Sequence, residues 1–367
     1  MGLAASLPVS AGTTSHGQPV PTGEAIMPAV ATGADEAALK ALSDLLAADM
    51  QACNRAIIAR MDSPVALIPQ LAAHLIAAGG KRLRPLLTLA AAHLCGYPAS
   101  PAEELAARHV NLAACVEFIH TATLLHDDVV DESHLRRGQA SANAVFGNKA
   151  SVLVGDFLFA RSFQLMTEDG SLPVMAILSQ ASATIAEGEV LQMATQNDLS
   201  TSMERYLQVI HGKTAALFAA ACRVGAIVAG RPHAEEMALD AYGTNLGMAF
   251  QLVDDALDYA ADQRLLGKTV GDDFREGKIT LPVLAAYDAG TEQDRVFWRR
   301  VIEESVQEPD DLEHALELIA ATDAISITLR HASDYAARAQ AALSIFADTR
   351  MRGLLADVAA YTVSRAR

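Results

Sequence analysis

The sequence predicts an all-α protein, and three observations support this fold class. Hydrophobic residues make up 51% of the 367 residues, and aromatic residues only 5%. Alanine and leucine supply most of the apolar content, whereas runs of β-branched residues are short, and this balance favours helices over sheets. No Asn-Gly or Asp-Gly pair joins two alternating runs, since the Asp-Gly pair at 169–170 lies between helical patterns. The apolar content is ample for a large core.

Helical patterns follow one another from about residue 36, separated by Gly, Pro or polar residues. We expect helices at 36–60, 64–78, 82–95, 102–131, 140–147, 150–167, 172–195, 202–229, 234–260, 280–289, 293–305, 310–320 and 323–365, the last with a break inside it. The segment 102–131 is the clearest, because it contains no Gly or Pro and begins with two glutamates before a sustained apolar face.

The first 35 residues differ from the rest of the chain. They contain no Lys or Arg and no compact apolar block before a cleavage site, so they resemble neither a signal peptide nor a transit peptide. Their Gly, Pro, Ser, Thr and Ala content predicts a disordered segment before one domain at 36–367. The most apolar stretch, 215–230, is interrupted by Arg223 and is interpreted as a core helix. We therefore expect a cytoplasmic protein without a transmembrane segment.

Charge and cysteine content argue against a nucleic-acid-binding protein and against a disulfide-bonded or zinc-binding one. The chain has 28 Lys and Arg against 44 Asp and Glu, so its net charge of −16 would repel nucleic acid and anionic membranes. The cysteines are widely spaced and form no CxxC pair, which is typical of buried thiols in a reducing compartment. They are Cys53, Cys95, Cys115 and Cys222.

Two acidic triplets end apolar segments, in LLHDDVVDE at 124–132 and QLVDDALD at 251–258. In each triplet the first and last carboxylates are four residues apart and share a helical face: Asp127 with Asp131 beside Asp128, and Asp254 with Asp258 beside Asp255. Like charges at this spacing need a cation or solvent. A solvated helix end explains most acidic clusters, but these follow apolar residues and so point toward a core or a cavity mouth. Oxygen-only ligands suit Mg²⁺, and no His or Cys has the spacing of a zinc site.

Basic loops accompany the acidic triplets. GGKRLRP at 79–85 combines a flexible turn with Lys and Arg at a helix start, which suits a diphosphate. HLRRG at 134–138 follows the first triplet, and Lys268 and Lys278 follow the second. The GKT at 212–214 is not a phosphate loop, because Leu207 replaces the required glycine and no strand precedes it. Together these features predict a site for two diphosphates and Mg²⁺ within a helical bundle.

GGKRLRP, LLHDDVVDESHLRRG, GKT, FQLVDDALD and LGKTVGDDFREGKITLP occur in this order. With these motifs the sequence resembles the trans-type isoprenyl diphosphate synthases, and most closely their long-chain polyprenyl members, such as octaprenyl, solanesyl and decaprenyl diphosphate synthases. The resemblance covers residues 36–367. It implies the all-α isoprenoid synthase fold, a large helical bundle around a central active-site cavity, and a homodimer.

The resemblance also implies a reaction. Three Mg²⁺ ions, with Mn²⁺ as a substitute, bind the diphosphate of an allylic substrate such as farnesyl diphosphate, whose departure leaves an allylic cation. Isopentenyl diphosphate attacks this cation, and loss of a proton completes the addition of one C5 unit. An apolar cavity protects the cation from water. The implied product is an all-trans C40–C50 polyprenyl diphosphate for a ubiquinone or other quinone side chain, released with weak membrane contact.

The family pattern assigns roles to individual residues. Asp127, Asp131 and Asp254 match metal ligands, with Asp128, Asp255 and Asp258 supporting them. Isopentenyl diphosphate contacts match Lys81, Arg84, His120 and Arg137. Allylic diphosphate contacts match Arg136, Lys213, Thr214, Gln251, Lys268 and Lys278. Independently of the family, His120 lies seven residues before Asp127 and therefore on the same helical face.

Product length is predicted from the residues just before the first triplet. The cavity should run away from Asp127 along Thr123, Ala122 and Val116. Short-chain relatives close this path with aromatic side chains, whereas Ala122 and Thr123 are small and would let a long product pass.

Other functions fit the sequence less well. A terpene cyclase does not need the second diphosphate site that GGKRLRP suggests, while a head-to-head condensing enzyme would share the fold and the ionisation step. An accessory subunit of a heteromeric synthase usually lacks carboxylates of one triplet, and both are intact here. A shorter-chain, geranylgeranyl-type synthase is the remaining alternative. A simple divalent-ion-binding protein would not need the basic loops.

Overall fold

In the computed structural model, residues 36–77, 80, 82–97, 108–136, 139–259 and 270–366 are described. They belong to one compact unit, Thr32–Arg367. The segment 1–35 and the predicted site residues Lys81, Arg137 and Lys268 lie outside the described residues. The predicted all-α fold is confirmed: among the described residues, the strands are limited to a hairpin with two residues on each side.

The helices follow the predicted order. Their bounds are α1 Glu36–Leu45, α2 Ala47–Arg60, α3 Leu67–Ala77, α4 Leu83–Leu94, α5 Arg108–Val130, α6 Ala142–Phe146, α7 Asn148–Asp169, α8 Leu172–Thr195, α9 Met203–Ile210, η2 His211–Ala215, α10 Ala216–Val228, α11 His233–Asp258, α13 Asp272–Arg275, α14 Leu281–Ala289, α15 Glu292–Trp298, η3 Arg299–Glu303, α16 Asp311–Ala321, α17 Ala324–Ala342, η4 Leu343–Ile345 and α18 Arg350–Ser364. The hairpin pairs β1 Leu135–Arg136 with β2 Gln139–Ala140 in antiparallel register.

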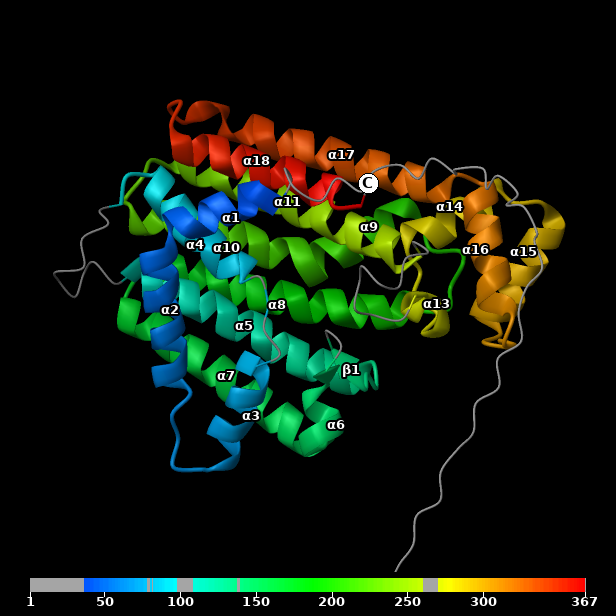
Figure 1. The fold of residues 1–367 in the computed structure, drawn as a ribbon, viewed down its shortest axis with the longest axis horizontal. Coiled ribbons are helices and arrows are strands. Elements are labelled where there is room, and N and C mark those ends of the chain that lie inside the picture. The colour runs from blue at the N-terminus through cyan, green and yellow to red at the C-terminus, as the bar shows by residue number, and fades with distance from the viewer. Residues whose placement is uncertain are drawn as a thin grey trace, which may run out of the picture. The chain divides into compact units, whose positions relative to one another are not determined.

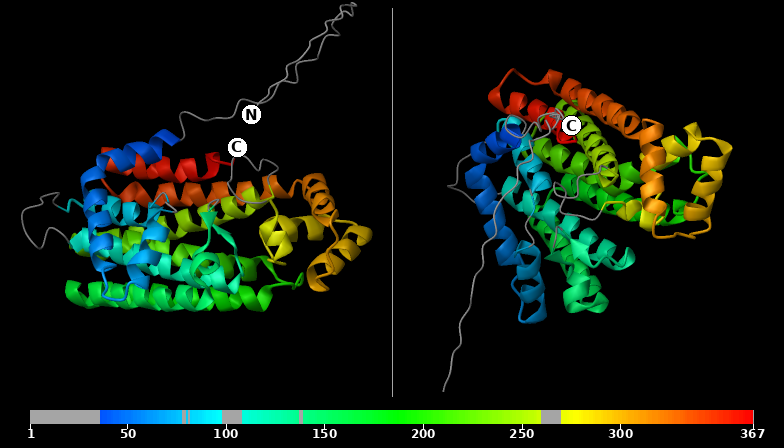
Figure 2. Two further views of the ribbon diagram at one scale, coloured as in Figure 1. Left: turned by 60° about the horizontal axis from the view of Figure 1, so that its bottom comes forward. Right: turned by 45° about the vertical axis from the view of Figure 1, so that its right-hand side comes forward.

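Long helices lie side by side in the core of this unit. Helix α5 packs against α7, α4 and α2, and α10 packs against α11, α4 and α8. Helix α11 also packs against α17, which lies beside α18 in Figure 1. Figure 2 shows α17 and α18, at the orange-to-red end of the colour range, side by side in two further views. One apolar cluster surrounds α5, α7 and α10, and a second surrounds α11, α14 and α17.

Small residues let some of these helices approach closely. A Cβ added at Gly225 of α10 would lie 2.6 Å from the Ala91 Cβ of α4. A Cβ at Gly243 of α11 would lie 2.4 Å from the Phe218 carbonyl oxygen of α10. Contacts this short leave no room for a side chain. The Gly- and Ala-rich composition therefore sets the spacing of the helices around α10.

The structure corrects several predicted boundaries. The segment 36–60 is broken at Leu46, and 202–229 is interrupted by the π-helical turn η2. Between the predicted helices the structure adds the short helix α13, before the predicted 280–289, and the hairpin, after the predicted 102–131. The break predicted within 323–365 is present after α17. None of the helices among the described residues is long and apolar enough to cross a membrane.

Candidate active site

The first triplet lies at the C-terminal end of α5, and its carboxylates have different surroundings. Asp127 is half-buried, and burial raises its pKa to about 7, a shift that nearby Glu189 and Asp131 reinforce and Lys213 opposes. The Asp131 backbone N–H donates to the Asp127 carbonyl at 2.8 Å, so the helical path continues through the triplet. These carboxylates keep some accessible surface and are available to a ligand.

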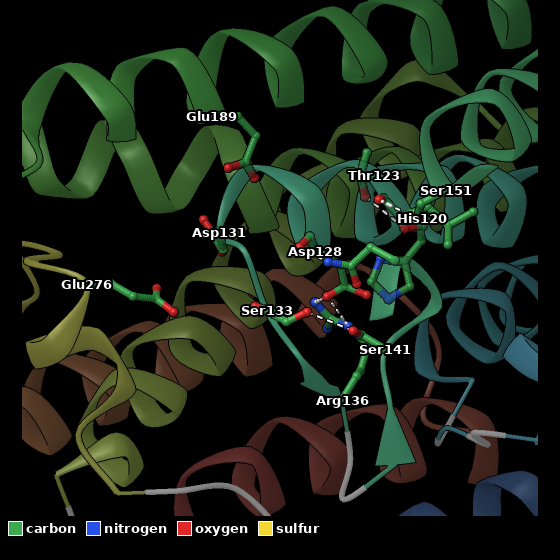
Figure 3. Close-up of polar contacts among 12 residues, drawn as sticks. His120, Thr123, Asp128, Asp131, Ser133, Arg136, Ser141, Ser151, Glu189 and Glu276 are labelled. Carbon is green, nitrogen blue, oxygen red and sulfur yellow. Dashed lines mark hydrogen bonds and ion pairs between the residues drawn. The ribbon is translucent and has the colours of Figure 1, made fainter. Parts of the chain in front are cut away.

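Asp128 is instead bound to the protein. Its side chain is 2% exposed, and its Oδ1 accepts hydrogen bonds from Nε and Nη2 of Arg136, with the Nε contact at 2.8 Å. Arg136 lies on β1, and the hairpin is anchored where Ser141 Oγ donates to the Ser133 carbonyl at 2.7 Å (Figure 3). Asn143 Nδ2 donates to the Asp128 carbonyl at 2.8 Å. Asp128 therefore positions the hairpin and its arginine next to the triplet.

The GKT motif forms the π-helical turn η2, an irregularity common at functional sites. A Cβ at Gly188 of α8 would lie 2.7 Å from the Lys213 backbone nitrogen, so the turn is held directly against α8. Lys213 Nζ lies 2.9 Å from Oε2 of Glu189, which is also on α8. Thr214 Oγ1 donates to Gln251 Oε1 at 2.7 Å. The turn thus brings Lys213 toward the first triplet and Thr214 toward the second.

The second triplet lies in the last two turns of α11. Asp255 is buried, and it accepts hydrogen bonds from the Tyr206 hydroxyl at 2.5 Å and from Gln251 Nε2 at 2.8 Å. Burial raises the pKa of Asp255 to about 7, and nearby Asp273 adds to the shift. Asp258 Oδ2 accepts the Asp273 backbone N–H at 3.0 Å, at the start of α13. Asp255 therefore fixes Tyr206 and Gln251, and Asp258 fixes the start of α13.

Asp254 of this triplet is partly accessible and pairs with a cation from another helix end. Its side chain is 41% exposed, and its Oδ1 accepts a hydrogen bond from Arg365 Nη2 at 2.7 Å. The Arg365 guanidinium also lies 4.3 Å from the centre of the Phe250 ring and donates to the Phe250 carbonyl. The end of α18 therefore places a cation on the carboxylate that the sequence assigns to a metal.

Lys278 connects the first triplet to the segment after the second. Its Nζ lies 3.0 Å from Asp131 Oδ2 and also contacts Glu276. Nearby Asp273, Asp131 and Glu276 raise the pKa of Lys278 against the opposing effect of burial. Figure 3 shows Asp131 at the end of α5, with Glu189 of α8 and Glu276 on either side of it. Carboxylates and cations from α5, α8, α13 and the loop after α13 therefore share one region.

The described residues of the first basic loop meet α5 about two to three turns before the triplet. Arg84 Nη1 lies 3.1 Å from His120 Nε2, and its guanidinium lies 4.5 Å from the centre of the Phe218 ring. Arg82, in a left-handed conformation with φ 48°, donates to Glu117 Oε1 at 2.8 Å. Arg84 and His120, which the sequence assigns to one diphosphate, are thus in contact.

The residues predicted to affect product length differ in position. Thr123 is half-buried on the Asp127 face of α5, and its hydroxyl donates to the His120 carbonyl at 2.8 Å. Ala122 and Val116 have no accessible surface and belong to the apolar cluster around α5. Of these side chains, only Thr123 faces accessible space in this structure.

Other polar residues of this region are absent from the sequence-based prediction. Glu117 binds Arg82, Glu189 binds Lys213, and Tyr206 binds Asp255, while Glu276 and Arg365 contact the residues described above. The position of Glu117, three residues before His120 on α5, is a signal that could have identified it. Glu189, Tyr206 and Arg365 lie outside the acidic and basic motifs, so only the tertiary structure places them here.

The donor set of the region fits Mg²⁺. The accessible groups Asp127, Asp131 and Asp254 offer oxygen atoms alone, as hard cations prefer. Burial has raised the pKa of Asp127, so its charged form needs a compensating cation. Each of the three carboxylates has a cation beside it: Lys213 near Asp127, Lys278 at Asp131 and Arg365 at Asp254, and these cations would also face an anionic ligand of the metal. The arrangement can bind a metal–diphosphate complex.

Comparisons with known proteins identify relatives along most of the chain. The sequence model of the family described as "Polyprenyl synthetase" matches residues 65–319. Octaprenyl diphosphate synthase from Escherichia coli is 47% identical over 329 residues, which cover 90% of this chain and 99% of that protein. All-trans-nonaprenyl-diphosphate synthase (geranyl-diphosphate specific) from Rhodobacter capsulatus is 40% identical, with 87% of this chain and 96% of that protein covered.

Solved structures are similar over the same extent. A decaprenyl diphosphate synthase from Rhodobacter capsulatus has a TM-score of 0.84 and 53% identity, covering 90% of this chain and 99% of that chain. A polyprenyl synthase from Caulobacter crescentus, complexed with calcium and isoprenyl diphosphate, has a TM-score of 0.85 and 52% identity, covering 90% and 98%.

Proposed function

Because the chain belongs to the polyprenyl synthetase family, we propose that it condenses isopentenyl diphosphate repeatedly with an allylic diphosphate, such as farnesyl diphosphate, to a C40–C50 product. The enzyme is a prenyltransferase that makes long-chain all-trans polyprenyl diphosphate. One observation carries the assignment of the site: carboxylates of the two triplets pair with cations from distant segments, Asp131 with Lys278 and Asp254 with Arg365, while Lys213 of η2 lies near Asp127. A ubiquinone or other quinone side chain is the proposed destination of the product.

Asp127, Asp131 and Asp254 are the proposed ligands of Mg²⁺, with three ions in each active site and Mn²⁺ as a substitute. The ions supply Lewis-acid stabilisation of the charge that develops on the departing diphosphate. Asp128 and Arg136 orient the hairpin, while Asp255 and Asp258 fix the end of α11 and the start of α13. Their buried or paired positions support a positioning role.

The cations are assigned to the two substrates. Lys213, Lys278 and Arg136 are proposed to bind the allylic diphosphate, together with Thr214, Gln251 and Lys268. Arg84 and His120 are proposed to bind isopentenyl diphosphate, together with Lys81 and Arg137. Three of the described cations pair with carboxylates in this structure: Lys213 with Glu189 at 2.9 Å, Lys278 with Asp131 at 3.0 Å, and Arg136 with Asp128. The arriving diphosphates would compete for the same cations.

The proposed assembly is a homodimer with residues 36–367 as the catalytic domain, and the proposed location is the cytoplasm. Large apolar side chains on α7 and α8 support a partner surface, because Leu153, Phe163, Val190 and Met193 are exposed. Analytical ultracentrifugation of the full chain tests this assembly.

The test of the reaction is incorporation of labelled isopentenyl diphosphate into extractable polyprenyl product by the purified chain alone. We expect incorporation that requires both an allylic primer and Mg²⁺ and that EDTA abolishes. Asp127→Asn and Asp254→Asn should each lower the rate by about 10²–10³-fold, because stabilisation of leaving-group charge is usually the largest catalytic term. The surface variant Asp44→Asn is the control, since Asp44 pairs with Lys40 on the exposed face of α1. Absence of incorporation without a second protein would favour an accessory subunit instead.

A further inference from the structure

Three side chains from different helices converge at the opposite end of α5 from the acidic triplet. Asp49 lies on α2, His93 in the last turn of α4, and His109 in the first turn of α5. Asp49 Oδ2 lies 2.5 Å from His93 Nε2 and 3.5 Å from His109 Nε2. One donor atom from each residue lies within 4.8 Å of the other two. Both imidazoles therefore direct the same ring nitrogen toward one carboxylate oxygen.

This cluster is separate from the candidate active site. His109 and Asp127 are on the same helix, and the rise of an α-helix places them about 27 Å apart. None of the residues assigned to Mg²⁺ or to a diphosphate belongs to the cluster. A ligand at this cluster is therefore independent of the proposed function.

The surroundings hold the His109 imidazole in place and leave the His93 and Asp49 side chains partly accessible. The His109 side chain is only 4% exposed, and its ring lies 4.9 Å from the Tyr97 ring and 5.9 Å from the His93 ring, measured between centroids. The His93 and Asp49 side chains are 18% and 20% exposed. A cation could reach the cluster from this side, and a water molecule could occupy a fourth ligand position.

We propose that Asp49, His93 and His109 bind a divalent transition-metal ion of the Zn²⁺ class. Two imidazole nitrogens and one carboxylate oxygen suit Zn²⁺ and related ions, whereas Mg²⁺ and Ca²⁺ prefer oxygen alone. Tetrahedral zinc places its donor atoms roughly 3.3 Å apart. The 3.5 Å separation between Asp49 and His109 is close to this spacing, and the shorter His93 hydrogen bond would open to admit the ion.

Such an ion would have a structural effect. Helix α2 packs against both α4 and α5. The ion would join these three helices at one point and stabilise the folded chain in proportion to the logarithm of its free concentration. Arg82 and Arg84 at the start of α4 contact Glu117 and His120 of α5. An ion at the other end of α4 would therefore hold this helix against α5 as well.

The test uses Co²⁺ as a spectroscopic probe for the full chain. The protein is stripped with EDTA, dialysed, and kept in excess Mg²⁺ so that the carboxylate site is occupied, and Co²⁺ is then titrated while visible absorption is recorded. We expect one Co²⁺ per chain, with the intense visible bands of a four-coordinate ion. His93→Gln and Asp49→Asn should each weaken Co²⁺ binding at least tenfold. Zn²⁺ should displace Co²⁺ from the unmodified chain and raise its melting temperature, but it should not raise the melting temperature of either variant.

His314→Gln is the matched control, because His314 also lies beside a carboxylate, with Nδ1 3.4 Å from Glu317 Oε2, but outside the cluster. It should bind Co²⁺ like the unmodified chain. His93 is partly exposed at a helix end, so His93→Gln retains the core, and circular dichroism verifies its fold. The proposal is overturned if the unmodified chain takes up no Co²⁺ in excess Mg²⁺. Equal uptake by His93→Gln and the unmodified chain would overturn it as well and identify the cluster as a plain His–Asp hydrogen-bonded group.

Discussion

Lys278 Nζ lies 3.0 Å from Asp131 Oδ2, although 147 residues separate them in the sequence. The same Nζ contacts Glu276 two residues earlier. This lysine is largely buried, with 16% of its side chain exposed, and its pKa is raised by nearby Asp273, Asp131 and Glu276. A charged lysine in this position balances the acidic triplet on α5 and is available to an arriving phosphate.

Lys278→Met tests this role. Removing the ammonium group leaves Asp131 and Glu276 without a shared counter-charge and removes a proposed contact to the allylic diphosphate. We expect KM for the allylic primer to rise at least tenfold and kcat to fall, because a partly buried charge pair is costly to break from one side. Lys40→Met, which removes an exposed surface pair with Asp44, should leave both constants unchanged. Equal effects of the two variants would refute the role of Lys278.

Gly188→Ala should damage the active site through the backbone. Its Cβ would lie 2.7 Å from the Lys213 nitrogen and 2.8 Å from the Gly212 carbonyl carbon, so α8 and η2 must separate. We expect a loss of about 1–3 kcal/mol in the free energy of unfolding, as overpacking usually costs. Activity per folded molecule should also fall, because Lys213 moves with the turn.

The matched control is Gly353→Ala on α18, where an added Cβ meets nothing within 4 Å. This change should stabilise the helix by up to about 1 kcal/mol, since alanine has the higher helix propensity. Urea unfolding and steady-state rates measure both variants. If Gly188→Ala is as stable and active as the control, η2 does not depend on the close approach to α8.

Mg²⁺ binding should depend on pH through Asp127. Burial raises the pKa of its carboxyl to about 7 from an ordinary value of 3.8, so the folded protein holds a proton between these pH values that the unfolded chain has released. The contribution of Asp127 to the stability of the metal-free protein therefore falls as pH rises from about 3.8 to about 7. Mg²⁺ needs the carboxylate, so its affinity should fall by up to about tenfold per pH unit below this pKa.

Calorimetry checks this prediction directly. At pH 6.5, Mg²⁺ binding should release protons, which appears as a dependence of the heat on the ionisation enthalpy of the buffer. Asp127→Asn should remove this dependence. A buffer-independent heat in the unmodified chain would mean that Asp127 is already ionised and would contradict the prediction.

Arg365 should oppose metal binding in the absence of substrate. Its guanidinium donates to Asp254 Oδ1 at 2.7 Å, on the carboxylate proposed as a ligand. Since Asp254 is 41% exposed, the pair is weak, and Arg365→Ala should raise the affinity for Mg²⁺ by no more than about fivefold. Titration with Mg²⁺ measures this change. Arg352→Ala, which removes contacts with Asp348 and the Phe346 carbonyl, should have no effect. A lower Mg²⁺ affinity in Arg365→Ala would show that the arginine supports the metal site.

Product length should respond to Thr123 and Ala122 in different ways. Thr123 has accessible surface on the Asp127 face, so Thr123→Phe should fill the proposed path and give products of C20 or shorter without unfolding the protein. Ala122 is fully buried, so Ala122→Phe should both shorten the product and lower the melting temperature. Chromatographic sizing of products and thermal unfolding separate these effects. Unchanged product length in both variants would refute the proposed path.

The helical fold could be predicted because its signals are local. The apolar periodicity of 234–260 agrees with α11 at His233–Asp258, and the acidic triplets reveal themselves by spacing on a single helix. The π-helical turn was not predictable in this way. It lies where Gly212 closely approaches Gly188 of another helix, a tertiary contact that no local pattern contains.

The same distinction applies within the candidate site. Sequence spacing predicts that Asp127 and Asp131 share a face, but it does not distinguish them from Asp128, which Arg136 binds in a buried pair. The contacts of Glu189 and Arg365 join segments far apart in the chain, so no local pattern contains them. Tertiary structure alone determines which carboxylates are accessible and which hold the scaffold.

The proposed reaction is tested most sharply by the size of the product that the purified chain makes from labelled isopentenyl diphosphate and farnesyl diphosphate with Mg²⁺. After hydrolysis of the diphosphate, reversed-phase chromatography separates the prenyl alcohols by length. We expect all-trans products of C40–C50 from the chain without any second protein. Products that stop at C20, cyclic hydrocarbons, or no elongation would contradict this expectation.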